Sequence, residues 1–208
     1  LENLGFVIMN KYIVFYGAIA ISAYGVGGKL VNLAYIPANS IGAIVATFIG
    51  QNLGADNRER ARKSYHAAMK LSLFFALVMT FLGMVLITPF IHIFVPQASA
   101  KLIAMTQEYA FYALLCGVFM CWYINLCGVF NGAGHTNYTF WLSMLRLWGF
   151  RIPMILLFHR YTALGIRGIW LSMLFSNMLE CVLGQAIYLR HRWEVSAVQQ
   201  SQNKTSCT

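Results

Sequence analysis

Charged residues are scarce in this sequence. Asp, Glu, Lys and Arg make up 10% of the 208 residues, and only six residues are acidic. A soluble domain carries roughly 25% charged residues, so this chain lacks the polar side chains needed to cover a water-facing surface. Hydrophobic residues make up 59% of the sequence, and the mean hydropathy is +0.63. The composition excludes an ordinary soluble domain and indicates a membrane protein.

Motifs for metal binding, disulfide pairing and catalysis are also lacking. The five cysteines form no CxxC pair and no Cys/His ligand spacing, so neither a disulfide framework nor a metal site is expected. The glycine-rich stretch GQNLGADN lacks the GxxxxGK[ST] spacing of a phosphate-binding loop. With no nucleophile–base pair and no cofactor fingerprint, we expect neither an enzyme nor a bound cofactor. The net charge of +9 does not predict nucleic-acid binding, because the basic residues are dispersed through apolar segments or stand at their ends.

Long apolar runs dominate what remains. A membrane-spanning helix needs about 20 mostly apolar residues. Six candidate runs cover residues 4–20, 26–49, 67–87, 102–129, 138–158 and 165–189. The expected fold class is therefore all-α and polytopic, with residues 1–192 forming one six-helix transmembrane domain. Residues 193–208 are polar and unpatterned, and we expect a disordered cytoplasmic tail there.

The connections between these runs carry turn chemistry. They are the stretches SAYGVGG, GQNLGADN, FVPQASAK, NGAGHTN and HRYTALGIRG. The chain opens at Leu1 with no basic n-region, so no signal peptide is expected. The first run is the shortest of the six, which fits a truncation upstream.

Lysine and arginine are divided unevenly between the two sides of such a bundle. One set of connections holds six basic residues: Arg58, Arg60, Arg62, Lys63, Arg190 and Arg192. The opposite set holds three: Lys101, Arg160 and Arg167. Cytoplasmic loops carry the excess of positive charge, so both ends of this segment are expected in the cytoplasm. The first four basic residues are expected to anchor the start of the third helix at the lipid headgroups.

Four stretches in order resemble a known family. GQNLGADNRERAR follows a proline-bearing helix (YIPANSIGAIVATFI), and GVFNGAGHTNY, RLWGFRIP and GIRGIWLS come after it. Over Asn3 to about Trp193 they resemble the C-terminal six-helix lobe of the multidrug and toxic compound extrusion (MATE) family. Members have two such lobes in one chain of twelve helices, with a central cavity between them, and exchange organic cations or other amphipathic compounds for protons or sodium ions.

The resemblance implies half of a secondary active antiporter in the cell membrane. Its expected partners are the lipid bilayer, small organic cations, and either a missing N-terminal lobe or a second copy of the chain. Some members carry a carboxylate in the first helix of this lobe and another in the fourth. Here the fourth-helix position falls near Met120, while the first helix offers Asn10 and Lys11. The coupling carboxylate is therefore expected in the N-terminal lobe, and no sodium-type site is predicted here.

Charged residues at membrane depth are the main candidates for function. At about 1.5 Å per residue, Glu180 lies roughly 15 Å from the cytoplasmic end of the sixth helix, and Arg146 roughly 12 Å from that of the fifth. The two helices are antiparallel neighbours, so the charges lie at one level and can pair. The same arithmetic places Arg151 level with Asn177. An ion pair that locks the helices is the favoured interpretation; a place in the proton or substrate path, and snorkelling at the lipid face, stay open.

Three further residues are candidates. Pro37 removes a backbone hydrogen bond in the middle of the second helix and is expected to kink it, either as a moving part or as static shape. Tyr123 and Asn125 lie deepest in the aromatic-rich fourth helix and are predicted to line the cavity. Aromatic rings can hold cationic ligands, although a place in the interface belt or in the packing of the lobe is the favoured interpretation of each aromatic residue taken singly.

Two alternatives to an antiporter remain. A lipid-linked precursor flippase shares the two-lobe fold and would line its cavity with more basic residues. A non-transporting scaffold, or an inactive truncated membrane protein, is the other.

Overall fold

The computed structural model describes residues 2–162, 164–190 and 193. Its elements, in chain order, are α1 (Glu2–Phe15), α2 (Ala18–Gly54), α3 (Arg58–Phe94), α4 (Ala100–Gly132), α5 (Thr136–Met144), the π-helix η1 (Leu145–Arg151), α6 (Ile152–Tyr161) and α7 (Ile166–Arg190). Because α5, η1 and α6 follow one another without a break, they form one long helical rod. The all-α prediction is confirmed.

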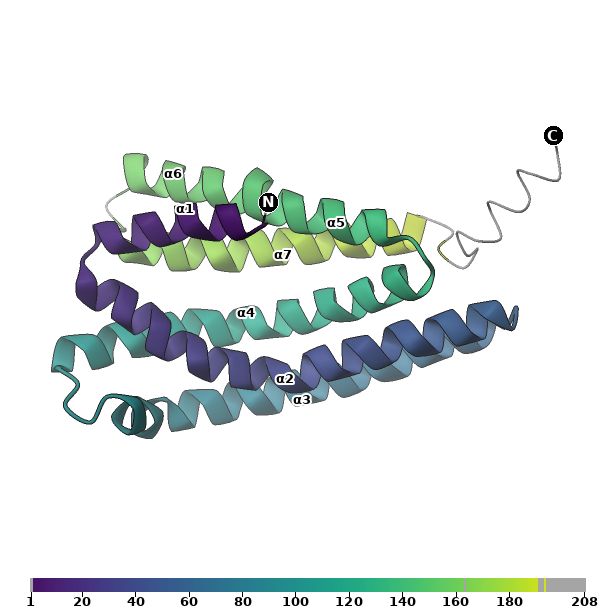
Figure 1. Ribbon diagram of the computed structural model, residues 1–208, viewed down its shortest axis with the longest axis horizontal. Coiled ribbons are helices and arrows are strands. Elements are labelled where there is room, and N and C mark those ends of the chain that lie inside the picture. The colour runs from purple at the N-terminus through teal and green to yellow at the C-terminus, as the bar shows by residue number, and fades with distance from the viewer. Residues whose placement is uncertain (1, 163, 191–192, 194–208) are drawn as a thin grey trace.

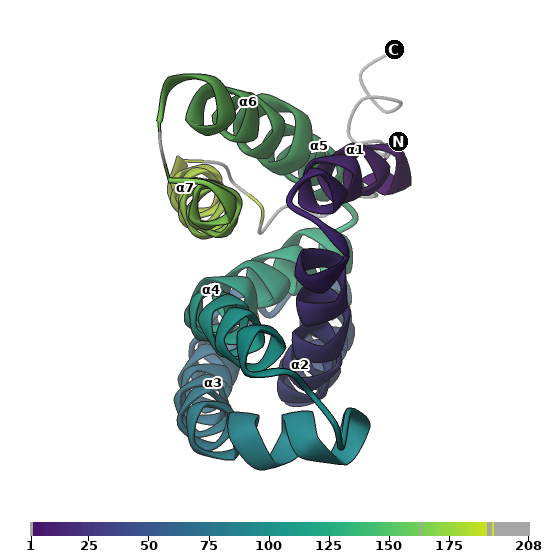
Figure 2. The ribbon, with the colours of Figure 1, turned by 90° about the vertical axis from the view of Figure 1, so that its left-hand side faces the viewer.

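The helices form two layers (Figures 1 and 2). One layer contains α2, α3 and α4, and the other contains α1, α7 and the rod of α5, η1 and α6. The connections α2–α3 and α4–α5 lie at the same end of the bundle as the end of α7, and the other connections lie at the opposite end. The segments 58–63 and 190 therefore share one end, as the count of basic residues assumed.

Within the described residues, five helical segments are long and apolar enough to cross a membrane: Ala18–Gly54, Arg58–Phe94, Ala100–Gly132, Thr136–Tyr161 and Ile166–Arg190. The sixth, α1, is a shorter apolar helix. Large apolar side chains are exposed along α3 at steps of three or four residues, namely Leu71, Phe74, Leu77, Phe81 and Val85. Such a stripe is not tolerated in water, but it suits a surface that faces lipid.

The predicted boundary between the first two helices is wrong. Residues 4–20 were expected to form one helix, followed by a turn at SAYGVGG, but the break falls at Gly17. Gly17 has φ of 102°, a left-handed conformation that favours glycine. The stretch SAYGVGG instead lies inside α2. A Cβ on Gly27 would stand 2.5 Å from the Tyr109 ring, so this glycine permits close packing and does not make a turn.

The other four turn stretches each contain a helix break. Asn57 caps the N-terminus of α3: its side chain accepts a hydrogen bond from the backbone N–H of Arg60 at 3.1 Å. Ser99 caps the N-terminus of α4 and accepts a hydrogen bond from the backbone N–H of Leu102 at 3.3 Å. These caps satisfy backbone donors that the first turn of each helix leaves without a partner.

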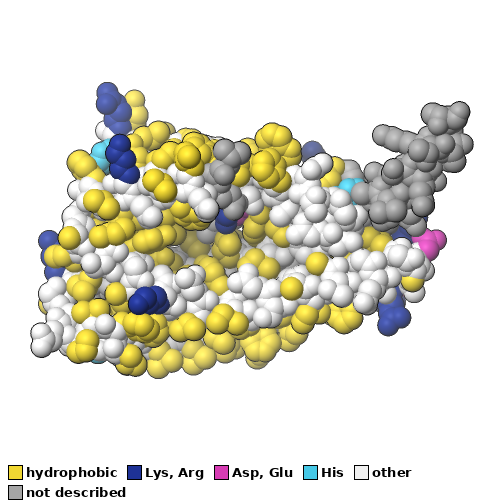
Figure 3. Space-filling model, in the orientation of Figure 1, with side chains coloured by type: hydrophobic (Ala, Val, Ile, Leu, Met, Phe, Trp, Pro, Cys, Tyr) yellow, Lys and Arg dark blue, Asp and Glu magenta, His cyan; other side chains and the backbone are white. Residues whose placement is uncertain are grey.

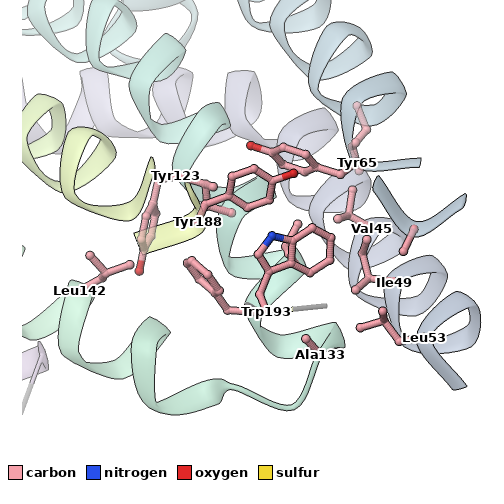
Figure 4. Packing of buried hydrophobic residues seen from close by; sticks show 14 residues of the cluster. Val45, Ile49, Leu53, Tyr65, Tyr123, Ala133, Leu142, Tyr188 and Trp193 are labelled. Atoms are coloured by element: carbon pink, nitrogen blue, oxygen red, sulfur yellow. The ribbon is translucent and has the colours of Figure 1, made fainter. Parts of the chain in front are cut away.

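The predicted tail begins one residue too early. Trp193 is only 3% exposed and stacks on Tyr188 with ring centroids 5.2 Å apart. Figure 4 shows the indole among the apolar side chains of the cluster that includes Ile49, Tyr65 and Ala133. It therefore covers the end of the core where α2 meets α3. Residues 194–208, the rest of the predicted tail, lie outside the described residues.

Glycines bring α2 and α4 into backbone contact. A Cβ on Gly128 would stand 2.6 Å from the carbonyl oxygen of Gly42, and one on Gly132 would meet the carbonyl oxygen of Ala46. Without a hydrophobic driving force between helices in lipid, small residues that permit such close approach are what hold helices together. The contact of α2 with α4 therefore depends on these glycines.

We predict that Gly128→Ala destabilises the protein by about 1–3 kcal/mol, because the added methyl group must push two backbones apart. The measurement is thermal unfolding in detergent, followed by circular dichroism. Gly25→Ala is the matched control, since no atom lies within 4 Å of its added Cβ, and alanine is the better helix former. Equal stability of the two variants would contradict the close contact.

Candidate functional site

A cavity of about 360 Å³ lies inside the lobe, between the two layers of helices. Its walls come from α1, α2, α4, η1 and α7. Figure 3 shows that the surface is hollowed between the layers, with hydrophobic side chains over both. The polar and aromatic residues that line it are Phe6, Tyr24, Lys29, Asn32, Tyr35, Tyr109, Arg146, Arg151 and Asn177. Three of the six residues predicted for the transport path, Arg146, Arg151 and Asn177, are among them.

The π-helix brings both arginines to this cavity. Arg146 and Arg151 are five residues apart, which in an α-helix would turn their side chains about 140° from each other. In η1, where hydrogen bonds close from i to i+5, the same separation is close to one turn. Pro153, two residues later, has no N–H to bond the carbonyl of Gly149. The wider turn before it accommodates that missing bond.

Arg146 and Glu180 form the predicted ion pair. The Nε of Arg146 lies 3.4 Å from Oε2 of Glu180, and the two side chains are 11% and 0% exposed. The guanidinium also lies 5.6 Å from the centroid of the Tyr123 ring and donates to the sulfur of Met120 at 3.4 Å. The pair joins η1 to α7 at the depth that helix geometry indicated, so the pairing is confirmed. Whether either residue acts in transport stays a prediction.

Arg151 makes the second predicted contact. Its Nε donates to the hydroxyl of Ser176 at 3.0 Å, and one terminal nitrogen donates to the side-chain oxygen of Asn177 at 2.7 Å. Arg151 is 3% exposed. Both acceptors are neutral, and no carboxylate forms an ion pair with Arg151 in the part of the chain that the structure describes. The guanidinium is therefore held in place by hydrogen bonds to neutral groups, with no carboxylate in direct contact among the described residues.

Aromatic rings form the outer wall of the cavity. Tyr24 stacks on Trp170, with ring centroids 6.2 Å apart and an interplanar angle of 6°. Tyr109 packs against both rings, at 5.1 Å from Tyr24 and 4.7 Å from Trp170. Tyr35 donates its hydroxyl to the carbonyl oxygen of Ala113 at 3.1 Å. The rings are thus fixed by contacts behind them.

Of these wall residues, Tyr24 was missed because it lies in the stretch taken for a turn. The usable signal was the glycine spacing, since Gly25 and Gly28 leave the space that the cavity fills.

Tyr123 and Asn125 do not line this cavity. Asn125 is fully buried, and its amide donates to the carbonyl oxygen of Cys121 at 2.7 Å. Tyr123 is 6% exposed, and its hydroxyl shares a 2.7 Å hydrogen bond with Ser143. In Figure 4 the Tyr123 ring lies beside Leu142 in the apolar cluster. Both residues are buried within this lobe; that they line a cavity between two lobes stays a prediction.

The remaining candidates lie away from the cavity. Pro37 falls near the midpoint of α2, and Figure 1 shows that α2 changes direction in the middle of its length. In the basic segment predicted to be a cytoplasmic anchor, Lys63 forms an exposed ion pair with Glu59 within α3. No group of three or more His, Cys, Asp or Glu side chains that could hold a metal ion occurs among the described residues.

We predict that Glu180→Gln destabilises the protein by about 3–5 kcal/mol, because it leaves a buried guanidinium without its counter-charge. The double variant Glu180→Gln with Arg146→Met should recover much of the loss. Thermal unfolding in detergent measures both.

The control for this prediction is the pair of Arg167 and Glu108, which joins α7 to α4 at 2.8 Å with side chains 64% and 26% exposed. Glu108→Gln should cost only about 0–1 kcal/mol, as for other accessible pairs. Unchanged stability in Glu180→Gln would refute a locking role for the buried pair.

Comparison with known proteins shows which family the chain resembles. The sequence model of the MatE family matches residues 1–157. The probable multidrug resistance protein NorM of Thermotoga maritima is 23% identical over 196 residues, which cover 94% of this chain and 42% of that protein.

Solved structures share the fold. An outward-facing and an inward-facing conformation of a multidrug resistance MATE family transporter of the MOP superfamily are each 18% identical to this chain, with TM-scores of 0.82 and 0.83. Each match covers 96% of this chain but only 44% and 45% of the transporter. The chain therefore spans less than half the length of these relatives. Since the family model matches well over half of its residues, the chain belongs to the MatE family of membrane transporters.

Proposed function

We propose that the chain is one lobe of a secondary active transporter that exports organic cations or other amphipathic compounds in exchange for protons or sodium ions. The observation that carries this proposal is the six-helix bundle that matches one half of the solved transporters, with 96% of this chain covered. Transporters of this kind bind substrate between two related halves. A complete path then requires a companion lobe, either the N-terminal lobe of the family or a second copy of this chain.

The contacts inside the lobe suggest which elements move together and which element bends. The pair of Arg146 and Glu180 fixes η1 to α7, so these two elements move together. The bend of α2 near Pro37 is the proposed moving part, because a helix with a missing hydrogen bond costs less to flex. Glu180 is engaged by an arginine inside its own lobe, which supports a coupling carboxylate in the companion lobe.

The flippase alternative has one observation in its favour. The charged residues among those that line the cavity, Lys29, Arg146 and Arg151, are all basic. A cavity of that sign suits the phosphate groups of a lipid-linked precursor. Translocation of such a lipid, with no efflux of cationic compounds, would support this second function over the first.

The proposed location is the cell membrane, with both ends of the segment in the cytoplasm. The support is the excess of Lys and Arg at the end of the bundle where α2 meets α3.

We predict that the chain alone, reconstituted into vesicles, drives no efflux of a cationic dye under an imposed proton or sodium gradient, because one lobe offers only half of the cavity walls. The chain combined with its companion lobe should restore gradient-dependent efflux. Efflux by the chain alone would contradict the proposal unless crosslinking shows a homodimer, in which a second copy supplies the missing walls.

We predict that, in a background without the native cysteines, Ala55→Cys resists a membrane-impermeant maleimide in intact cells, while Gln97→Cys is labelled. Both positions are exposed, and they lie in the α2–α3 and α3–α4 connections at opposite ends of the bundle. Because the two variants differ only in the side of the membrane they report, the opposite labelling pattern would invert the proposed orientation.

A further inference from the structure

The charges around the cavity do not cancel. Arg146 and Arg151 line it, and the carboxylate that approaches them is that of Glu180, which pairs with Arg146. Among the side chains that the structure describes here, Arg146, Arg151 and Glu180 are almost fully buried and together carry a net charge of +1. A buried charge is costly unless an opposite charge compensates it. The site is therefore electrostatically prepared for an anion.

Arg151 is the residue that can bind it. A guanidinium has five N–H donors in one plane, and two of them are directed at Ser176 and Asn177. These hydrogen bonds fix the plane of the group without adding a negative charge. Because Arg151 lines the cavity, donors not used by these two acceptors are available to a carboxylate or sulfonate, which accepts such donors in pairs.

The walls indicate the shape of the rest of the ligand. Next to Arg151 the cavity is lined by the rings of Tyr24, Tyr35 and Tyr109 and by the apolar side chain of Met173. Its volume of about 360 Å³ falls in the range of roughly 300–1,000 Å³ typical of small-molecule sites. Aromatic rings and Met173 beside the arginine side chains fit an aromatic body that carries one acidic group.

Lys29 adds a positive charge nearer the surface. It is exposed, and its ammonium lies 4.6 Å from the centroid of the Phe94 ring. Because Lys29 also lines the cavity, it adds a third basic side chain to the site. Charges of one sign along a cleft raise the local concentration of ligands of the opposite sign.

We propose that this cavity binds a small aromatic or amphipathic organic anion, with its carboxylate or sulfonate on Arg151 and its apolar body among the tyrosine rings. The proposal concerns the cavity inside the lobe and holds whichever compounds pass between two lobes. It differs from the cation site that an exporter of organic cations would need, which then lies outside this cavity.

The test compares two probes of one shape and opposite charge. Binding of 4-fluorobenzoate and of 4-fluorobenzylammonium to the full chain in lipid nanodiscs is followed by fluorine NMR line broadening, with empty nanodiscs as the blank. We expect saturable broadening of the benzoate that unlabelled benzoate reverses, and at least tenfold weaker binding of the ammonium compound. Equal binding of both probes, or no saturable binding of the benzoate, would overturn the proposal.

The Asn177→Asp variant tests the role of Arg151 without removing the arginine. The new carboxylate has the shape of the amide and accepts the same hydrogen bond, so it supplies the missing counter-charge. We expect at least a tenfold loss of 4-fluorobenzoate binding with no loss of thermal stability. Arg151→Met should lose binding as well, whereas Arg167→Met, which removes an equal charge from an exposed site on α7, should keep it.

Parental affinity in folded Asn177→Asp would refute the assignment to Arg151. If both cavity variants fail to fold, the comparison of the two probes on the parent chain decides the proposal alone.

Discussion

The guanidinium of Arg146 on η1 and the carboxylate of Glu180 on α7 lie 3.4 Å apart, in a chain that has few charged residues. In lipid, polar groups must find their partners inside the protein, because no water is present to replace them. The pair therefore sets the register of α7 against the long rod of α5, η1 and α6. Once that register is set, Arg151 falls beside Ser176 and Asn177, and the cavity acquires its inner end.

Helix irregularities, rather than loops, shape this site. The π-helix rotates the residues after Arg146 so that Arg151 faces the same space, and the glycines of α2 leave that space open while Gly27 lets the helix approach Tyr109. A regular α-helix in place of η1 would keep the same residues but turn the two arginine side chains to different faces. The lobe thus holds its polar groups on rigid elements, which is what a binding site needs in order to keep its geometry as the lobe moves.

Depth along a helix could be predicted from the sequence, whereas direction around the helix could not. Each residue advances about 1.5 Å along the axis but turns about 100° around it. An error of one or two residues in a predicted helix boundary therefore changes the depth of a residue by only a few ångströms. Glu180 still lies level with Arg146, and Arg151 with Asn177. The same error is large enough to send a side chain to another face, and Tyr123 and Asn125 proved deep but directed into the core.

The other differences arise from tertiary packing. SAYGVGG has the composition of a turn, but its Gly27 is needed for close packing against Tyr109, which is distant in the sequence. Trp193 follows a polar connection, yet it covers apolar side chains of α2 and α3. Neither contact has a local signal, because each partner lies far away along the chain.

The sign of the charge in the cavity links these features to the ligand that we propose for it. A lobe with a pair of opposite charges alone would be neutral at its centre, and it would offer little to a charged ligand beyond its aromatic walls. The second arginine on the same π-turn breaks that balance, and because its partners are neutral side chains, the excess charge stays inside the lobe.

A protein that moves amphipathic compounds must bind each one weakly enough to release it. A single positive charge beside fixed aromatic rings offers one strong contact and several weak ones. Such a site fixes the orientation of a ligand without binding it with high affinity, so the ligand can be released again.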